Sequence, residues 1–106
     1  MDLQDKNLQK IITAVKLVGG KRLIVFGSRA RGKEKKNSDL DLCLLVSDDK
    51  NLLEYKKKLR LKLWDLGYNW QWPLDLHVYS KDLYQKRITQ GDPFVEEISK
   101  GVILYE

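Results

Sequence analysis

The stretch Val25–Leu42, VFGSRARGKEKKNSDLDL, decides the fold that the sequence predicts. An apolar run ends in Gly27-Ser28, a short basic turn follows, and Asp39 and Asp41 then open a second apolar run. Glycine can adopt backbone angles that bring amides close to a ligand, and free N–H groups at a helix start attract anions. This order predicts a phosphate-binding turn followed by a pair of metal-binding carboxylates.

The carboxylate pair lies in DLDLCLLV, residues 39–46, a segment with the apolar character of a strand. Side chains two residues apart on a strand project from the same face, so Asp39 and Asp41 should point together, away from Leu40 and Leu42. Neighbouring carboxylates repel each other unless a cation lies between them. Mg²⁺ is usually held by one or two carboxylates together with substrate phosphates, which makes the two aspartates candidate Mg²⁺ ligands.

A third candidate carboxylate follows in LDLHVY, residues 74–79. Period-two alternation places Asp75, His77 and Tyr79 on one strand face. An aspartate inside an apolar strand is costly to bury unless it meets a cation or hydrogen-bond donors. Asp75 is therefore predicted to complete a three-carboxylate site, as a metal ligand or as a base. His77 is left out of the site, because the spacing offers it no partner metal ligand.

The rest of the chain alternates between helical and strand periodicity, which predicts the α/β class. Helices are expected over 2–18, 51–66, 80 or 82 to 87, and 92–100; strands are expected over 21–26, 39–46 and 74–79, with a closing apolar run over 102–105. Residues 47–49, Ser-Asp-Asp, are a plausible N-terminal cap for the second helix. Trp70 and Trp72 are expected in the core or an interface, although base stacking stays open.

Length and composition limit the possible functions. A chain of 106 residues predicts one domain over 1–106, and 20 basic against 15 acidic residues suit nucleotides, nucleic acid or an acidic protein partner. The lysine cluster over 56–62 lacks an interleaved aromatic row, so direct nucleic-acid binding is not expected. The lone Cys43 excludes a disulfide framework. No signal peptide or membrane-spanning run is apparent, which predicts a cytoplasmic protein with no membrane contact.

GSRARG, residues 27–32, followed by SDLDL, residues 38–42, resembles the signature of the nucleotidyltransferase superfamily that includes DNA polymerase beta and the kanamycin nucleotidyltransferases. The resemblance is closest to its minimal nucleotidyltransferase (MNT) branch, and implies a small mixed sheet flanked by helices. Arg31 matches a phosphate-contacting arginine, and Asp75 matches a third acidic residue on a later strand. Ser38 either contacts the nucleotide or closes the turn.

The expected reaction follows from these residues. Asp39 and Asp41 would hold two Mg²⁺ ions, Asp75 would bind the second ion or take a proton, and the turn with Arg31 would grip the phosphates. The resemblance implies AMP transfer from ATP to a hydroxyl, plausibly a tyrosine, of a HEPN toxin, with this chain as antitoxin. Two alternatives stay open: an antitoxin that acts by binding alone, and a transferase for a small molecule or RNA, with further surface from a partner subunit or a homodimer.

Overall fold

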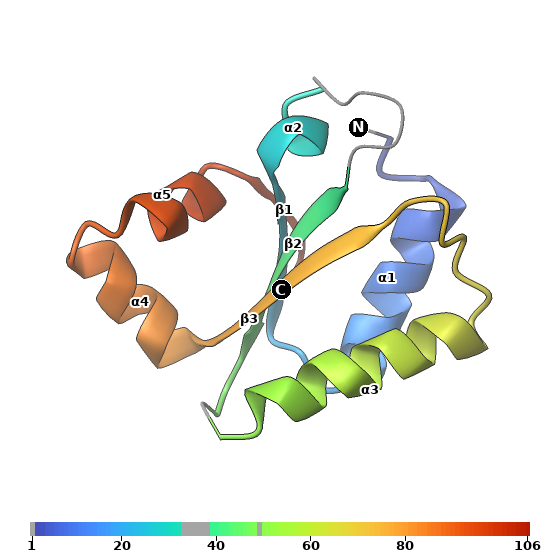
Figure 1. Cartoon of the computed structure of the whole chain (residues 1–106), viewed down its shortest axis with the longest axis horizontal. Coiled ribbons are helices and arrows are strands. Elements are labelled where there is room, and N and C mark those ends of the chain that lie inside the picture. Colours follow the sequence, from blue (N-terminus) through green and yellow to red (C-terminus); the bar gives the residue numbers. More distant parts are fainter. Residues whose placement is uncertain (1, 33–38, 49) are drawn as a thin grey trace.

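The computed structural model describes residues 2–32, 39–48 and 50–106 (Figure 1). The helices are α1 (Lys6–Leu17), α2 (Gly27–Ala30), α3 (Leu52–Asp65), α4 (Lys81–Thr89) and α5 (Pro93–Ser99), and the strands are β1 (Arg22–Phe26), β2 (Leu40–Val46), β3 (Leu74–Ser80) and β4 (Val102–Tyr105). The strands form one sheet in the order β3-β2-β1-β4. β1 is antiparallel to β2 and β4, whereas β2 and β3 are parallel, so the predicted small mixed sheet is confirmed.

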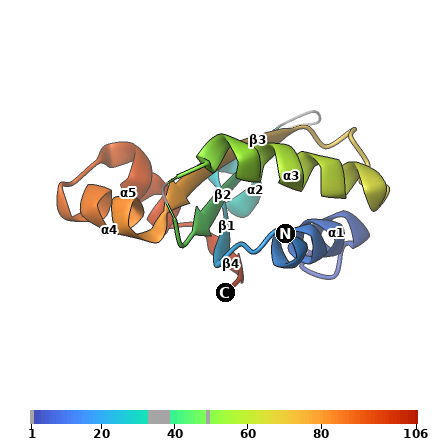
Figure 2. The same cartoon turned by 90° about the horizontal axis from the view of Figure 1, so that it is seen from below.

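Helices cover both faces of the sheet, α1 and α3 on one face and α4 and α5 on the other (Figure 2). The central strand β2 is buried on both faces, which explains its nearly continuous apolar sequence. Leu40, Leu42 and Leu44 enter the cluster beneath α1 and α3, while Cys43 and Leu45 enter the cluster beneath α4 and α5. The alternation places Asp41 on the same sheet face as Cys43, as the sequence predicted.

Two helices differ from the prediction at their N-terminal ends, α1 in its first residue and α3 in its cap. α1 begins at Lys6, because the Asp5 carboxylate accepts hydrogen bonds from the amides of Asn7 and Leu8 and caps the first turn. α3 is preceded by Asn51 in the left-handed conformation, with φ of 62° and no side-chain cap. The expected cap at residues 47–49 is wrong for Asp48, whose carboxylate accepts from the amide of Lys50 in a local turn. Residue 49 lies outside the described part of the chain.

The C-terminal half follows the prediction more closely. Ser80 caps α4 by accepting from the amide of Leu83, and Asp92 caps α5 with Pro93 in the first turn. The closing apolar run is the strand β4, which pairs with β1 and places the end of the chain at one edge of the sheet. In the part of the chain that the structure describes, no helix combines the length and apolar character needed to cross a bilayer.

Cys43 is expected to be chemically inert in the folded protein. Its side chain is buried in the middle of β2, and burial raises the pKa of the thiol to about 12. Because the thiolate is the nucleophile, a maleimide at pH 8 should leave the native protein unmodified and label it fully in denaturant. Mass spectrometry of the two reactions measures this. Rapid labelling of the native protein would contradict the buried position.

Candidate active site

Two of the predicted carboxylates meet on neighbouring strands. Asp41 of β2 and Asp75 of β3 are partners in the parallel register, so their side chains project from the same sheet face. The pKa of Asp41 is raised, first by burial, then by the charge of Asp75 and a side-chain hydrogen bond with it, and then by the charge of Asp39. The three acidic groups are therefore close enough to repel one another, and a cation between them would relieve that repulsion.

The position of Asp39 differs from the prediction. The residue precedes β2, which begins at Leu40, and is exposed. Within residues 2–32, 39–48 and 50–106, no group of three or more His, Cys, Asp or Glu side chains is gathered so that it could hold a metal ion. The expected three-ligand metal site is thus not preformed there. Asp39 lies before the paired part of β2, so the strand register does not place its side chain beside Asp75.

Asp75 is more accessible than the sequence suggested. Its side chain is 52% exposed, so the expectation of a costly buried aspartate is wrong. The cause is the place of β3 at the edge of the sheet, which only the strand order reveals. The prediction that Asp75 lies beside Asp41 is nevertheless confirmed by the strand register.

His77 contacts the site, although the sequence analysis left it out. Its Nε2 atom lies 3.3 Å from Oδ2 of Asp75, and its side chain is only 29% exposed. The ring packs against Phe26 and Phe94, at centroid distances of 5.8 and 5.0 Å. These two rings fix the imidazole, which in turn holds one orientation of the Asp75 carboxylate. The shared strand face of residues 75 and 77 was the available signal.

The Gly27-Ser28 turn lies directly against the carboxylates. Gly27 begins α2 with φ of 77°, a conformation that L side chains rarely adopt. A Cβ added there would overlap Oδ2 of Asp41 and lie 3.2 Å from its Cγ. Ser28 follows in α2 and is partly buried. The predicted phosphate turn therefore lies directly against the carboxylate of Asp41, whereas Ser38 lies outside the described residues.

Arg31 lies beside the turn in an ion pair. Its Nη1 atom is 2.8 Å from Oε1 of Glu97 in α5, and both side chains are largely exposed. Next to this pair is a cavity of about 190 Å³, lined by Gly27, Ala30, Arg31, Glu97, Lys100 and Gly101. Glu97 and Lys100 were missed by the sequence analysis, because nothing in the chain near α5 indicates that it folds beside the turn.

The neighbouring arginine has a different environment. The Arg29 guanidinium lies 4.7 Å from the centroid of the Trp72 ring, which is a cation–π distance. Trp70 packs edge-on against Tyr68, with ring centroids 4.8 Å apart. Both tryptophans lie at the margin of the core beneath α1 and α3, as the sequence predicted. The two arginines therefore serve separate contacts, and only Arg31 lines the cavity beside Gly27.

One family model and several solved structures are similar to this chain. The family model described as "Nucleotidyltransferase domain" matches residues 8–100. A solved structure described as a toxin–antitoxin with AMP-PNP is similar, with a TM-score of 0.57 and 21% identity over 95% of this chain and 73% of that one. A second, a toxin–antitoxin MntA-HpeT mutant, has a TM-score of 0.54 and 20% identity over 92% of this chain and 71% of that one.

These structural similarities show the fold. No curated protein matched the sequence. The family match covers most of the chain, including the Gly27 turn and all three aspartates, and confirms the resemblance stated from the sequence. The chain belongs to the nucleotidyltransferase domain family.

Proposed function

We propose that this protein transfers AMP from ATP to a tyrosine hydroxyl of a HEPN toxin partner, and thereby acts as its antitoxin. The observation that carries the proposal is the position of Asp41, which lies beside Asp75 on one side and against Gly27 on the other. A phosphate-binding turn and clustered carboxylates are the two parts that nucleotidyl transfer requires. We treat residues 1–106 as one minimal domain.

The donor set fits Mg²⁺. Asp39, Asp41 and Asp75 offer hard oxygen ligands, and the pKa of Asp41 is raised first by burial and then by its acidic neighbours, so a cation beside it would favour the ionised form. The absence of a three-ligand group in the described residues is compatible with Mg²⁺, because this ion commonly completes its coordination with substrate phosphates and water. When bound, two such ions would neutralise the phosphates and activate the attacking hydroxyl.

The protein's own residues would bind and orient the reactants. The amides and hydroxyl at Gly27 and Ser28 would bind the phosphates of ATP, and Arg31 would add a cation to the same group. Asp75 would receive the proton of the acceptor hydroxyl while the acceptor oxygen bonds to the α-phosphorus and pyrophosphate departs. His77 would hold Asp75 in place through the 3.3 Å contact.

The partner assignment rests on two supports. The sequence resembles the MNT branch, whose members often pair with HEPN toxins, and the similar solved structures are described as toxin–antitoxin proteins, one of them with AMP-PNP. The excess of basic over acidic residues in this chain suits an acidic protein partner.

Incubation with labelled ATP, Mg²⁺ and the toxin encoded by the adjacent reading frame tests the proposal. The wild-type protein should label the toxin, and an Asp39→Ala/Asp41→Ala variant should not. A variant with the exposed residues changed instead, Asp48→Ala/Asp65→Ala, is the control for lost acidic charge. Labelling that survives loss of Asp39 and Asp41 would contradict the proposal.

A second candidate is an antitoxin that neutralises by binding alone. The observation in its favour is that no three-ligand group is preformed in residues 2–32, 39–48 and 50–106. The two candidates differ in one measurement, the survival of cells that express the toxin. Full protection by the Asp39→Ala/Asp41→Ala variant would favour binding, whereas loss of protection would favour transfer.

Arg31 should affect ATP binding more than catalysis. Arg31→Ala is expected to raise KM for ATP about tenfold, the effect of losing one charge-assisted phosphate contact. Glu97→Gln should lower KM two- to threefold, because the Glu97 carboxylate competes with phosphate for the guanidinium. Arg87→Ala, which breaks a partly exposed ion pair with Asp92, is the control. Steady-state kinetics measure all three, and an unchanged KM in Arg31→Ala would remove Arg31 from the site.

A further inference from the structure

The strand β3 is an open edge of the sheet. In the described part of the chain it pairs only with β2, and the opposite side of the strand has no strand neighbour. Exposed edges are usually protected by proline, lysine or a bulge. The segment His77–Ser80 contains no proline or lysine and pairs with β2 without a register shift. This edge is therefore available to another strand.

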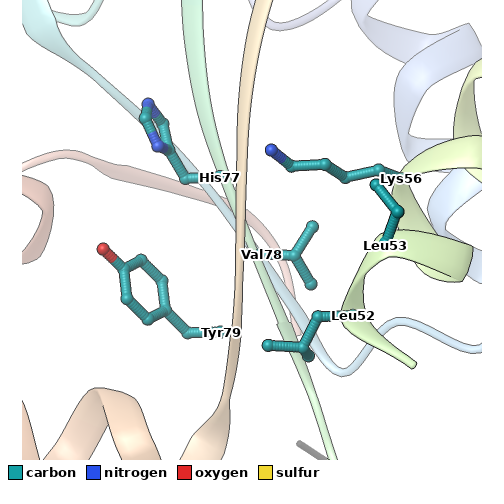
Figure 3. A pocket seen from close by; sticks show the side chains of 6 residues that line it. All are labelled: Leu52, Leu53, Lys56, His77, Val78 and Tyr79. Atoms are coloured by element: carbon teal, nitrogen blue, oxygen red, sulfur yellow. The ribbon is translucent and has the colours of Figure 1, made fainter. Parts of the chain in front are cut away.

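A cavity of about 320 Å³ lies over this edge, lined by Leu52, Leu53, Lys56, His77, Val78 and Tyr79 (Figure 3). His77, Val78 and Tyr79 are consecutive, and neighbouring side chains of a strand point to opposite faces. Figure 3 shows His77 and Tyr79 on one side of β3, and Val78 on the side of α3. A cavity lined by three consecutive strand residues must reach both faces of the sheet. This cavity therefore lies along the outer edge of β3.

The backbone hydrogen bonds of β3 show which of its residues face outward at the cavity. The Leu40 amide donates to the Pro73 carbonyl at 2.8 Å, so the backbone groups of residue 73 point toward β2. Along a strand, every second residue directs its backbone groups to the same side. Residues 75, 77 and 79 then direct their backbone groups toward β2, and Leu76 and Val78 direct theirs outward. Val78 thus offers an N–H and a C=O at the cavity. Added strands are recognised by such backbone groups together with pockets for alternate side chains.

His77 is the residue that links the cavity to the candidate active site. His77 lines the cavity and contacts Asp75, and the two residues are about 7 Å apart along the strand. A segment bound at Val78 would therefore bring a side-chain hydroxyl within reach of Asp75. ATP phosphates, by contrast, are assigned to Gly27 on the opposite side of Asp41, so the two substrates would approach from different directions.

Charge indicates what kind of segment would bind. Lys56 lines the cavity from α3, and its side chain extends toward β3 (Figure 3). Arg60 of the same helix donates a hydrogen bond from Nη2 to the Leu74 carbonyl of β3, at 3.5 Å. A second copy of this chain would bring the same formal net charge of +5 against this surface. An acidic segment of a different protein is the better electrostatic match.

We infer that the open edge of β3 binds an extended, acidic segment of the partner protein as an added strand and presents its hydroxyl to Asp75. The inference rests on the proposed function, because it identifies where the acceptor docks. Its binding step, however, requires neither ATP nor the carboxylates. Docking and transfer can therefore be measured separately.

The test changes the backbone donor at the centre of the cavity. Val78→Pro removes the outward N–H, and proline is tolerated on edge strands. Val78→Thr keeps the N–H and the branched side chain and is the matched control. Calorimetry in the Asp39→Ala/Asp41→Ala background, with the toxin of the adjacent reading frame as the probe, should show at least about a thirtyfold loss of affinity for Val78→Pro and less than a threefold change for Val78→Thr.

A charge reversal gives an independent readout should the proline variant fail to fold. Lys56→Glu should weaken toxin binding about tenfold, whereas Lys62→Glu, the same charge change on the exposed part of α3 away from the cavity, should change it less than threefold. Equal effects of the two reversals would overturn the inference. So would wild-type affinity in a folded Val78→Pro variant, or a homodimer of this chain, seen by sedimentation, that Val78→Pro dissociates.

The outcomes separate the two proposals. Suppose that the wild-type protein binds the toxin but transfers no label, and that Val78→Pro abolishes binding. This result would support the docking site and contradict the transfer reaction. If the wild-type protein and Val78→Pro transfer label at the same rate, the result would support the transfer reaction and contradict the docking site.

Discussion

Asp41→Asn should lower nucleotidyl transfer by about a thousandfold and at the same time raise the thermal stability of the metal-free protein. The loss is expected because, among the described residues, Asp41 lies beside both Asp75 and the Gly27 turn, so it would hold the metal next to the phosphates. The amide of asparagine keeps the shape of the side chain and removes the charge. Single-turnover kinetics with labelled ATP measure the loss.

The stability gain follows from the electrostatics of the same residue. Burial, the charge of Asp75 and the charge of Asp39 raise the pKa of Asp41 above its unfolded value, so its ionised form destabilises the folded state. In chelator, the stability of wild type relative to Asp41→Asn should therefore be greater at low pH and fall as the pH rises through the folded pKa of Asp41. At neutral pH, Asp41→Asn should melt about 5 °C higher, corresponding to about 1 kcal/mol.

Asp48→Asn is the matched control for the stability measurement. Asp48 is exposed and accepts one backbone hydrogen bond, which asparagine can also accept. Its melting temperature should stay within about 1 °C of wild type. An Asp41→Asn protein that is less stable than wild type, or one that retains transfer, would show that the carboxylates do not repel each other at a metal site.

Gly27→Ala should reduce transfer about a hundredfold and destabilise the protein. Alanine at φ of 77° costs about 1–2 kcal/mol, and its Cβ would overlap Oδ2 of Asp41. The carboxylate would have to move away from Asp75 or the turn would have to open. A displacement of about 1 Å in a catalytic group can by itself lower a rate a hundredfold.

Gly19→Ala separates the two effects in Gly27→Ala. Gly19 has a similar φ of 81°, but an added Cβ there would meet no atom within 4 Å. This variant should lose similar stability from backbone strain and keep nearly full activity. Thermal melting and transfer assays on both variants give the comparison. Equal activity of the two would mean that the contact between Gly27 and Asp41 has no catalytic role.

Local sequence rules predicted most of the elements. The alternation in β2 and β3 gave the faces of Asp41 and Asp75, because the period of a strand is the same in every protein. The caps at Ser80 and Asp92 followed from short side chains that accept hydrogen bonds from nearby amides. The predicted start of α3 near Asn51 is confirmed, but its cap was mispredicted, since Asp48 accepts a local hydrogen bond in place of capping the helix.

The candidate site was predicted only in part. Gly27, Asp41 and Asp75 were identified from their residue types, and the structure places them in contact. His77 was omitted because a histidine on a strand face is ambiguous until its neighbours are known. The exposure of Asp75 was mispredicted for a related reason, as it depends on the edge position of β3.

The sequence by itself determined the secondary structure, the family and the candidate site residues, because these depend on side-chain chemistry at short spacing. Only the tertiary structure decided which distant segments meet. It joined β2 to β3 in a parallel register, brought Glu97 to Arg31, and left one side of β3 open beside His77. The physical reason is that strand order and helix packing arise from burial of apolar surface shared by the whole chain, which no local pattern encodes.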